Sequence, residues 1–431
     1  MPARPRALGA LVALFTAGYL APYLLPTVVG RLSAGLALST AQAGLVGSIL
    51  LLGSACAGFV LASRVERLGP RRAARLGLLA MALGYGTAAA SGTLPPVVAG
   101  AVLGGFGSGT ATAVAAAGIA GRPDPHRAAT LGLLSVSATA GVLYLSLPHL
   151  GGGHALPFAA IAATALLTYP TTAHLPTTPP TPHTPRPHLT PLPHRRAGAV
   201  LAGSILCWSM AQNALWGVSG RIGLTQAGLS EVTLGLVFAA ALGAGLAGVT
   251  AAGALGRRLG RVTPIGAGTL LIALCVLLSS SAEGPYSFAT GEILWNAVYP
   301  VVLSYLLGLA ASLDPRGRWA VLVGSASSLG VACGPVTGST LASAAGYQGM
   351  GLTLCALLLL VAAPMTAVAH RTTPRPPAPP LPEPGASPQP PGRPAAVPSN
   401  AGRAGWDPQS PPSQSPPSPS PLSTHSIPAG V

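Results

Sequence analysis

Glu292 lies inside an apolar stretch, residues 287–310, and is the acidic side chain best placed for proton or cation chemistry. It shares one helical face with an indole, an amide and a phenol, since the spacing is i, i+3, i+4 and i+7 for Glu292, Trp295, Asn296 and Tyr299. A carboxyl group in that setting can exchange a proton or hold a cationic group. The alternative is a glutamate near lipid headgroups, with the two aromatic residues as interfacial anchors.

Two other apolar stretches carry polar and aromatic residues on one helical face. Within 197–218 these residues are Ser209, Gln212, Asn213 and Trp216. Within 7–29 they are Thr16, Tyr19 and Tyr23. Hydrocarbon disfavours such faces, so we expect all three stripes to point into the protein or a cavity. They are our candidate residues for a substrate cavity and for coupling.

The composition places these stretches in a membrane. The chain has 431 residues, of which 50% are hydrophobic and 7% charged, whereas soluble domains carry about 25% charged residues. The net charge of +15 comes from Arg between the apolar stretches, without a basic face of interleaved aromatics, so nucleic acid is not expected as a partner. The five Cys lie singly in apolar runs, which favours neither disulfides nor a metal site, and no cofactor motif is found.

About 20 apolar residues are needed for each helix that crosses a bilayer. The sequence predicts twelve such spans, and the first is read as a retained helix rather than a cleaved signal. They cover approximately 7–29, 41–62, 73–91, 95–118, 128–147, 155–170, 197–218, 232–254, 264–282, 287–310, 318–340 and 348–369. Residues 171–196 are rich in Pro, Thr and His and are expected to form a linker, and 371–431 a disordered tail.

The distribution of Arg predicts the orientation. With both termini in the cytoplasm, every Arg except Arg31 and Arg221 falls in a cytoplasmic loop, at the N-terminus or in the tail. We therefore expect a multi-pass protein of the cell membrane. Glu231, which follows Ser230 at the start of a span, fits a helix cap and dipole partner.

The two halves of the chain are related by a shift of 191 residues. "LSTAQAGLV" (38–46) falls on "LSEVTLGLV" (229–237), and Arg67-Leu68-Gly69 falls on Arg258-Leu259-Gly260. The repeat predicts an all-α integral membrane fold of twelve helices in two pseudo-symmetric six-helix bundles of the same orientation. The expected domains are residues 1–170 and 197–370, joined by the linker and followed by the tail.

The loop after the second span carries the most specific motif. Residues 62–72, "ASRVERLGPRR", resemble the Gly-x-x-x-Asp-Arg/Lys-x-Gly-x-Arg/Lys-Arg/Lys motif of the major facilitator superfamily. Ala62 and Glu66 replace the first Gly and the Asp, and the second copy has Arg257 where the acid would stand. The resemblance extends over residues 1–370. It implies a cytoplasmic gate formed by Glu66, Arg67, Gly69, Arg71, Arg72, Gly253, Arg258 and Gly260.

The resemblance also implies that helices 1, 4, 7 and 10 line a central cavity. Three of these helices carry the stripes above, while helix 4 is rich in Gly and offers Ser108 and Thr110. Proton-coupled exporters of the family often have an Arg in helix 4, where this chain has Ala101. The shift of 191 places Glu292 at the symmetry-related position, which makes it our candidate for proton coupling. "GVACGPVTG" (330–338) resembles an exporter motif but lies in helix 11, where small residues favour close helix packing.

These observations predict a secondary transporter that works by alternating access. The sparse charge favours a small neutral, aromatic or cationic organic compound, and we expect proton-coupled efflux by a monomer in the lipid bilayer. Uptake of a metabolite is the alternative within the same class. The alternative from another class is a non-transporting membrane sensor on the same fold. An enzyme is not expected, because the His residues are scattered over loops, linker and tail. Drive by ATP is not indicated, because the sequence has no Walker-type loop.

Overall fold

The computed structural model describes residues 5–62, 68–151, 153–177, 191–255, 260–314 and 316–372. The elements of the first half are α1 (Pro5–Tyr23), α2 (Leu25–Gly35), α3 (Thr40–Ala62), α5 (Pro70–Ala90), α6 (Leu94–Ala120), α7 (Pro125–Ser146), η1 (Leu147–Leu150), α8 (Ala155–Thr168) and η2 (Tyr169–His174). Those of the second half are α9 (Arg195–Arg221), η3 (Ile222–Gln226), α10 (Glu231–Leu255), α11 (Val262–Ser280), α12 (Pro285–Ser312) and α13 (Arg318–Thr372). Every element in this described part is helical, as expected for backbone that must satisfy its own hydrogen bonds in lipid.

The first predicted span is bent rather than straight. It begins as α1 and continues as α2 after a bend of 49°, so that it reaches Gly35 and not residue 29. Pro22 and Pro26 flank the bend, and proline removes the amide donor on which a continuous helix depends.

The last two predicted spans form one long element with an internal break. Gly346 interrupts α13 with a φ of 71°, a conformation that residues with a Cβ rarely adopt. Nine described helices, α13 included, are long and apolar enough to cross a membrane, and the bent pair α1–α2 makes ten. Counting α13 as two spans and adding the more polar α9 gives twelve, which confirms the predicted helix count.

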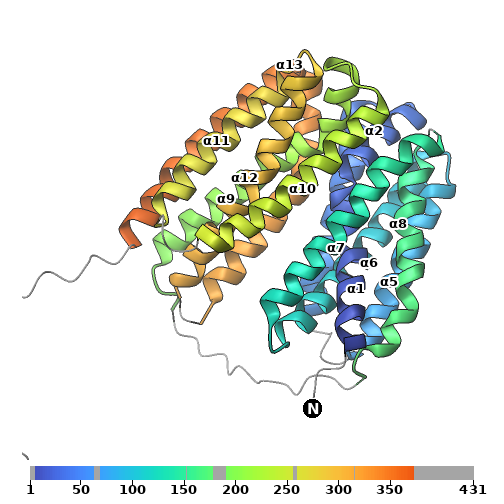
Figure 1. Cartoon of the computed structure of the whole chain (residues 1–431), viewed down its shortest axis with the longest axis horizontal. Coiled ribbons are helices and arrows are strands. Elements are labelled where there is room, and N and C mark those ends of the chain that lie inside the picture. Colours follow the sequence, from blue (N-terminus) through green and yellow to red (C-terminus); the bar gives the residue numbers. More distant parts are fainter. Residues whose placement is uncertain are drawn as a thin grey trace, which may run out of the picture. The chain divides into compact units, whose positions relative to one another are not determined.

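The helices pack as two groups (Figure 1). In the first group α6 packs on α1, α3 and α5, while α7 packs on α1 and α8 on α5. In the second, α13 packs on α9 and α11, while α12 packs on α10 and α11. The main contacts between the groups are α3 with α13, α7 with α10, and α2 with α9. The predicted two-bundle fold is therefore confirmed, while the domain limits at residues 170 and 197 stay a prediction, since η2 and α9 extend into both ends of the expected linker.

Glycines allow the closest approaches within each bundle. A Cβ on Gly105 of α6 would lie 2.1 Å from the Leu50 carbonyl oxygen of α3. In the second bundle, a Cβ on Gly330 or Gly338 of α13 would lie 2.2 or 2.1 Å from a backbone oxygen of α9. The fourth predicted span, which is α6, and the stretch 330–338 of α13 are thus rich in small residues because neighbouring backbones lie against them.

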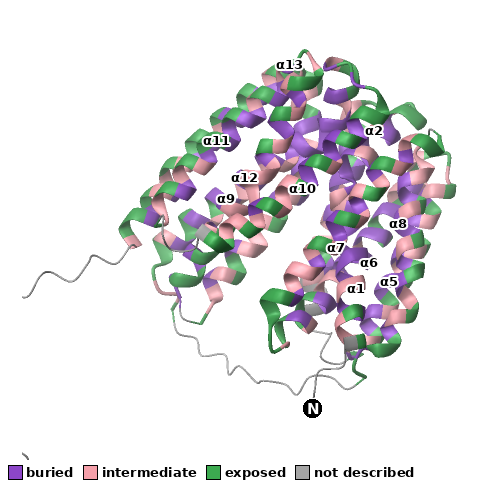
Figure 2. Cartoon of the chain, viewed as in Figure 1, coloured by how far each residue is buried: buried purple, intermediate pink, exposed green. Residues whose placement is uncertain are grey.

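The outward faces of the bundles are apolar (Figure 2). Exposed leucines line α5 and α11, as expected for faces in contact with lipid; they include Leu76, Leu79, Leu83, Leu270, Leu271 and Leu274. The buried residues gather between helices, and Figure 2 shows many of them around α2. The polar stripes of α9 and α12 therefore face the protein interior rather than lipid.

Asp314 fixes the turn between α12 and α13. Its Oδ2 accepts a hydrogen bond from Arg318 Nε at 2.7 Å, and its Oδ1 accepts one from the Arg316 backbone amide at 3.1 Å. The bond from Arg318 holds the pKa of this carboxyl below its ordinary value. A lowered pKa contributes stability above the ordinary carboxyl pKa, and that stability is lost as the pH falls through the lowered value.

We therefore expect Asp314→Asn to lower the melting temperature of the purified protein at neutral pH. The two proteins should converge in strong acid, where the aspartate is protonated. Thermal unfolding followed across the acid range tests this, with Asp124→Asn as the control. Asp124 caps α7 by accepting from the Arg127 backbone amide, a bond that an asparagine oxygen can also accept. An equal difference at every pH would contradict the assignment.

Candidate substrate and proton site

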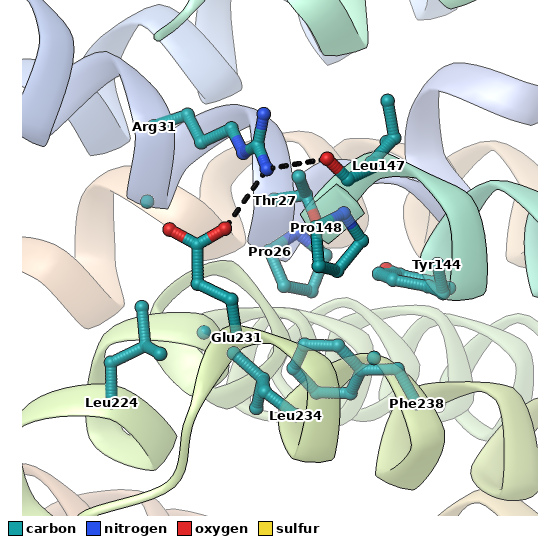
Figure 3. A pocket seen from close by; sticks show the side chains of 13 residues that line it. Pro26, Thr27, Arg31, Tyr144, Leu147, Pro148, Leu224, Glu231, Leu234 and Phe238 are labelled. Carbon is teal, nitrogen blue, oxygen red and sulfur yellow. Dashed lines mark hydrogen bonds and ion pairs between the residues drawn. The ribbon is translucent and has the colours of Figure 1, made fainter. Parts of the chain in front are cut away.

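The two bundles are joined at one end of the helices, which we call the Arg31 end because α2 ends there and α10 begins. Arg31 Nη2 forms an ion pair with Glu231 Oε2 at 3.0 Å and donates to the Leu147 carbonyl oxygen at 3.1 Å (Figure 3). The same side chain donates to the Gly151 carbonyl oxygen at 2.9 Å. Figure 3 shows the guanidinium of α2 aimed at α10 across a small pocket, lined largely by apolar residues such as Leu234 and Phe238.

Three further hydrogen bonds cross between the bundles near this end. Trp216 Nε1 donates to the Pro22 carbonyl oxygen at 3.1 Å, the Val336 amide donates to Ser48 Oγ at 2.9 Å, and Arg221 donates to Ser33. Among the described residues, every hydrogen bond and ion pair given between the bundles lies in this half of the molecule. This conformation is therefore closed at the Arg31 end.

Glu292 lies wholly inside the second bundle, with none of its surface exposed. Its Oε1 accepts a hydrogen bond from Ser219 Oγ of α9 at 2.9 Å. Its Oε2 lies near the Ser279 Oγ of α11, and in the described part of the chain neither of these two buried atoms makes a hydrogen bond of good geometry. The carboxyl group therefore faces neighbouring helices rather than lipid headgroups. A site of this kind is suited to taking up and releasing a proton, because a protonated carboxyl gains a donor.

The stripes of α9 and α12 meet in an aromatic cluster. Trp295 Nε1 donates to Gln212 Oε1 at 2.9 Å, and Gln212 Nε2 donates to the Trp208 carbonyl oxygen at 3.1 Å. The Trp208 ring stacks on Tyr299 with centroids 5.3 Å apart, and Trp216 lies 5.6 Å from Trp295. The cluster presents aromatic faces fixed by an amide, and no charged side chain lies among these five residues.

The remaining polar residues of both stripes hold their own helices. Asn213 and Asn296 each donate to the carbonyl oxygen four residues earlier, at 2.9 and 3.0 Å, and both are half-buried. Ser209 Oγ lies 2.7 Å from Ser327 Oγ of α13. These contacts leave the side-chain oxygens of the two asparagines without a hydrogen bond among those that the structure gives.

The stripe of α1 is only partly brought to the same place. Tyr19 and Tyr23 lie close enough to Tyr299 for their phenols to interact electrostatically. Thr16, in contrast, donates to Ser135 Oγ of α7 at 2.8 Å and is buried inside the first bundle. Ser108 of α6, the fourth predicted span, also faces the inside of the first bundle, since its Oγ lies 3.0 Å from the Tyr85 hydroxyl of α5.

The expected gate motif is described in part. Glu66, Arg67 and Arg258 lie outside the described residues, and Gly253 lies exposed within α10. Gly69 and Gly260, which the repeat superposes, have φ values of 76° and 65°. Gly69 begins α5, whose first turn carries Arg71 and the exposed Arg72. The repeated Gly therefore meets the same backbone requirement in both loops, while the gating role stays a prediction.

Several residues of the site were missed from the sequence. Ser219 continues the face of Gln212 and Trp216, at i+7 and i+3, and could have been found by extending that stripe by one turn. Ser279 is the first of three consecutive serines at the end of an apolar run, and no helical spacing of polar residues singles it out. Glu231 was expected to cap α10, but Ser230 Oγ accepts from the Thr233 amide at 3.2 Å, and Glu231 pairs with Arg31.

Comparison with known proteins agrees with this geometry. The family model described as Major Facilitator Superfamily matches residues 7–318. Among solved structures, the human organic anion transporter MFSD10 (TETRAN) is 18% identical with a TM-score of 0.61, and the match covers 85% of this chain and 100% of that one. A bacterial homologue of the human lysosomal transporter Spinster, solved in an inward-facing and unoccupied conformation, is 15% identical with a TM-score of 0.63, covering 85% and 95%.

A third structure, the POT family transporter PepTSo, is 13% identical with a TM-score of 0.67, covering 86% of this chain and 99% of that one. None of the curated protein sequences matches the chain. Two bundles of membrane-spanning helices, together with the family match, define the class of a multi-pass membrane transporter. The chain belongs to the major facilitator superfamily.

Proposed function

We propose that this protein is a proton-coupled exporter of a small neutral, aromatic or cationic organic compound in the cell membrane. The proposal rests first on Glu292, a carboxyl group buried between α9, α11 and α12, to which no arginine or histidine of the described residues is bonded. Burial of an unpaired carboxylate is costly, so the group favours the protonated form whenever water is excluded. Opening and closing of the bundles can then take up and release a proton.

The substrate class follows from the aromatic cluster. Trp216, Trp295 and Tyr299 offer ring faces, and Asn213 and Asn296 offer amide oxygens, while Arg31 and Arg221 are engaged at the Arg31 end. Aromatic faces and carbonyl oxygens suit planar rings and cations. The likeness to the organic anion transporter MFSD10 shows the fold alone and does not indicate an anionic substrate.

Alternating access requires the bundles to separate at one end while they meet at the other. In support of this mechanism, the contacts between them are concentrated at the Arg31 end, which the Arg distribution predicts to face outward. Both termini are then cytoplasmic, and the site opens toward the cytoplasm before export. The direction of transport is proposed from the resemblance to exporters, and the protein is proposed to act as a monomer.

The test is an untargeted comparison of metabolites inside and outside cells that express the wild type or Glu292→Gln. We expect a compound that the wild type moves outward and the variant does not. Inward movement by the wild type would indicate an uptake permease. Equal movement by both proteins would remove Glu292 from the mechanism, and movement by neither would contradict export and favour a membrane sensor.

A further inference from the structure

Ser219 Oγ lies within hydrogen-bond distance of two acceptors, and its single proton can be donated to only one of them. Its Oγ lies 2.9 Å from Glu292 Oε1 and 3.0 Å from the carbonyl oxygen of Leu215, four residues earlier in α9. A serine hydroxyl has one proton, so it can donate to the carboxylate or to its own helix, but not to both. Ser219 is fully buried, so bulk water does not reach its hydroxyl.

The charge on Glu292 decides between these two acceptors. An ionised carboxylate is the stronger acceptor and draws the Ser219 proton to Oε1. A protonated carboxyl accepts weakly at Oε1, and its own proton can satisfy Ser279 Oγ, so that both of the unpartnered buried oxygens gain a bond. Ser219 is then free to donate to the Leu215 carbonyl oxygen. A bond of this kind, from a serine to the backbone four residues earlier, often bends the helix.

The described groups around Glu292 do not supply a competing charge. Two of its titratable neighbours, close enough to interact electrostatically, are Cys275 of α11 and Tyr144 of α7, a thiol and a phenol. Tyr144 donates its hydroxyl to the Tyr23 carbonyl oxygen at 2.6 Å. The charged side chains at the nearby ends of α9 and α10 bond elsewhere: Arg221 to Ser33, and Glu231 to Arg31.

The turn of α9 that contains Ser219 is also the one that holds the first bundle. Trp216 and Arg221 donate to α1 and α2, and a Cβ on Gly220 would lie 2.8 Å from the Pro26 carbonyl oxygen. Immediately afterwards the helix widens into the π-helical turn η3, a feature often found at functional sites. Gln226 Nε2 fixes the end of that turn to the carbonyl oxygens of Ser280 and Ala282, both at 2.9 Å.

We propose that Ser219 is a proton-operated switch. It donates to the Leu215 carbonyl oxygen when Glu292 is protonated and to Glu292 when that residue is ionised. The choice of acceptor controls how tightly α9 packs on α2. The switch rests on the proposed proton coupling and adds the path by which the proton reaches the Arg31 end. Ser219 is a positioning residue, since it acts through α9. Protonation favours the closed Arg31 end seen in this conformation, and ionisation loosens it.

Trp216 is a native reporter of this contact between the bundles, because its indole bonds to the Pro22 carbonyl oxygen and becomes exposed to water when the Arg31 end opens. The emission of the purified full-length protein is recorded from acidic to alkaline pH, and the spectrum of the matching Trp216→Phe variant is subtracted. In parallel, the carboxylic acid band of Glu292 is followed by infrared difference spectroscopy, with Glu292→Gln to identify it. For the wild type we expect the red shift of Trp216 and the loss of the acid band to share one midpoint.

The decisive variant is Ser219→Ala. We expect the acid band still to titrate, while the Trp216 emission no longer follows pH; Ser219→Thr, which keeps a hydroxyl, should restore the response. Ser204→Ala is the matched control, a buried serine of the same helix that lies away from Glu292, and should behave as the wild type.

Three results would overturn the switch. They are a Ser219→Ala emission that follows pH like the wild type, a wild-type emission that is constant with pH, and a shift produced by sodium at fixed pH. Failure of the proposed function is seen separately, as transport that is equal in the wild type and Glu292→Gln. A constant Trp216 emission beside a transport defect in Glu292→Gln therefore rejects the switch alone.

Discussion

Replacing Glu292 by glutamine should remove the response of transport to a proton gradient. Glutamine has nearly the same shape and can still accept from Ser219, but it cannot release a proton. Coupling free energies between two ligands are typically about 1–3 kcal/mol, so we expect gradient-driven transport to fall roughly 5- to 150-fold. Exchange of substrate across the membrane without a gradient should continue, because it needs only the movement of the bundles.

The measurement uses proteoliposomes and the compound identified by the metabolite comparison. Flux is recorded with and without a pH difference, and then as exchange against unlabelled substrate. Glu283→Gln is the matched control, since it neutralises an exposed acid in the loop just before α12. A Glu292→Gln protein that still responds to the gradient would place the coupling proton elsewhere. Loss of exchange as well would indicate damage to the substrate site rather than to coupling.

The helical stripes were predictable because their spacing is local. Glu292 and Trp295 share a face of any helix, as do Gln212 and Trp216, and hydrocarbon excludes both faces. Their mutual contact follows once the family resemblance places helices 7 and 10 around one interior. The hydrogen bond from Trp295 to Gln212 is the physical result of that placement.

Contacts that depend on three-dimensional packing were not predictable. Thr16 has the same spacing relationship to Tyr19 as the other stripe residues have to one another, yet it faces Ser135, because the rotation of α1 is set by its packing on α6 and α7. Arg31 and Glu231 are 200 residues apart, and neither local pattern indicates the other. Arg31 was expected in a loop, as an exception to the positive-inside distribution, and Glu231 was expected at the start of a span, as a helix cap.

The pairing of these residues explains that exception. Arg31 and Arg221, the two arginines expected on the outer side, both bond across to the opposite bundle. Arg31 lies near the end of the first span, α1–α2, and Arg221 at the end of the seventh, α9, and the repeat superposes these two spans. An arginine that holds two bundles together need not contribute to orientation, so its place outside is compatible with the cytoplasmic bias of the others.

The repeat also predicted two equivalent glycines, and their contacts suggest the second large effect. Gly44 and Gly235 occupy the same position in the matched segments 38–46 and 229–237. A Cβ on Gly44 of α3 would lie 1.9 Å from Ser339 Oγ of α13, and one on Gly235 of α10 would lie 2.2 Å from the Tyr144 carbonyl oxygen of α7. Both glycines therefore lie at contacts between the bundles: Gly44 where α3 meets α13, and Gly235 where α10 meets α7.

We expect Gly44→Ala and Gly235→Ala to fold but to favour a conformation that is open at the Arg31 end. Overpacking costs about 1–3 kcal/mol, and here the cost falls on the closed conformation alone, since the opposing backbones separate when that end opens. The expected population shift is roughly tenfold or more. It is measured as the labelling rate of Ser48→Cys, a buried position on α3 in the same contact, by a membrane-impermeant maleimide, with the five native cysteines as background.

Gly105→Ala provides the contrast, because the Leu50 carbonyl oxygen lies 2.1 Å from its added Cβ within the first bundle. Movement of one bundle against the other does not relieve that contact, so the same overpacking cost falls on folding, and we expect a lower melting temperature with unchanged labelling of Ser48→Cys. Gly44→Ala should show the reverse, faster labelling at a nearly unchanged melting temperature. If both variants only lowered the melting temperature, the contact of α3 with α13 would belong to a rigid core, and the bundles would not separate at the Arg31 end.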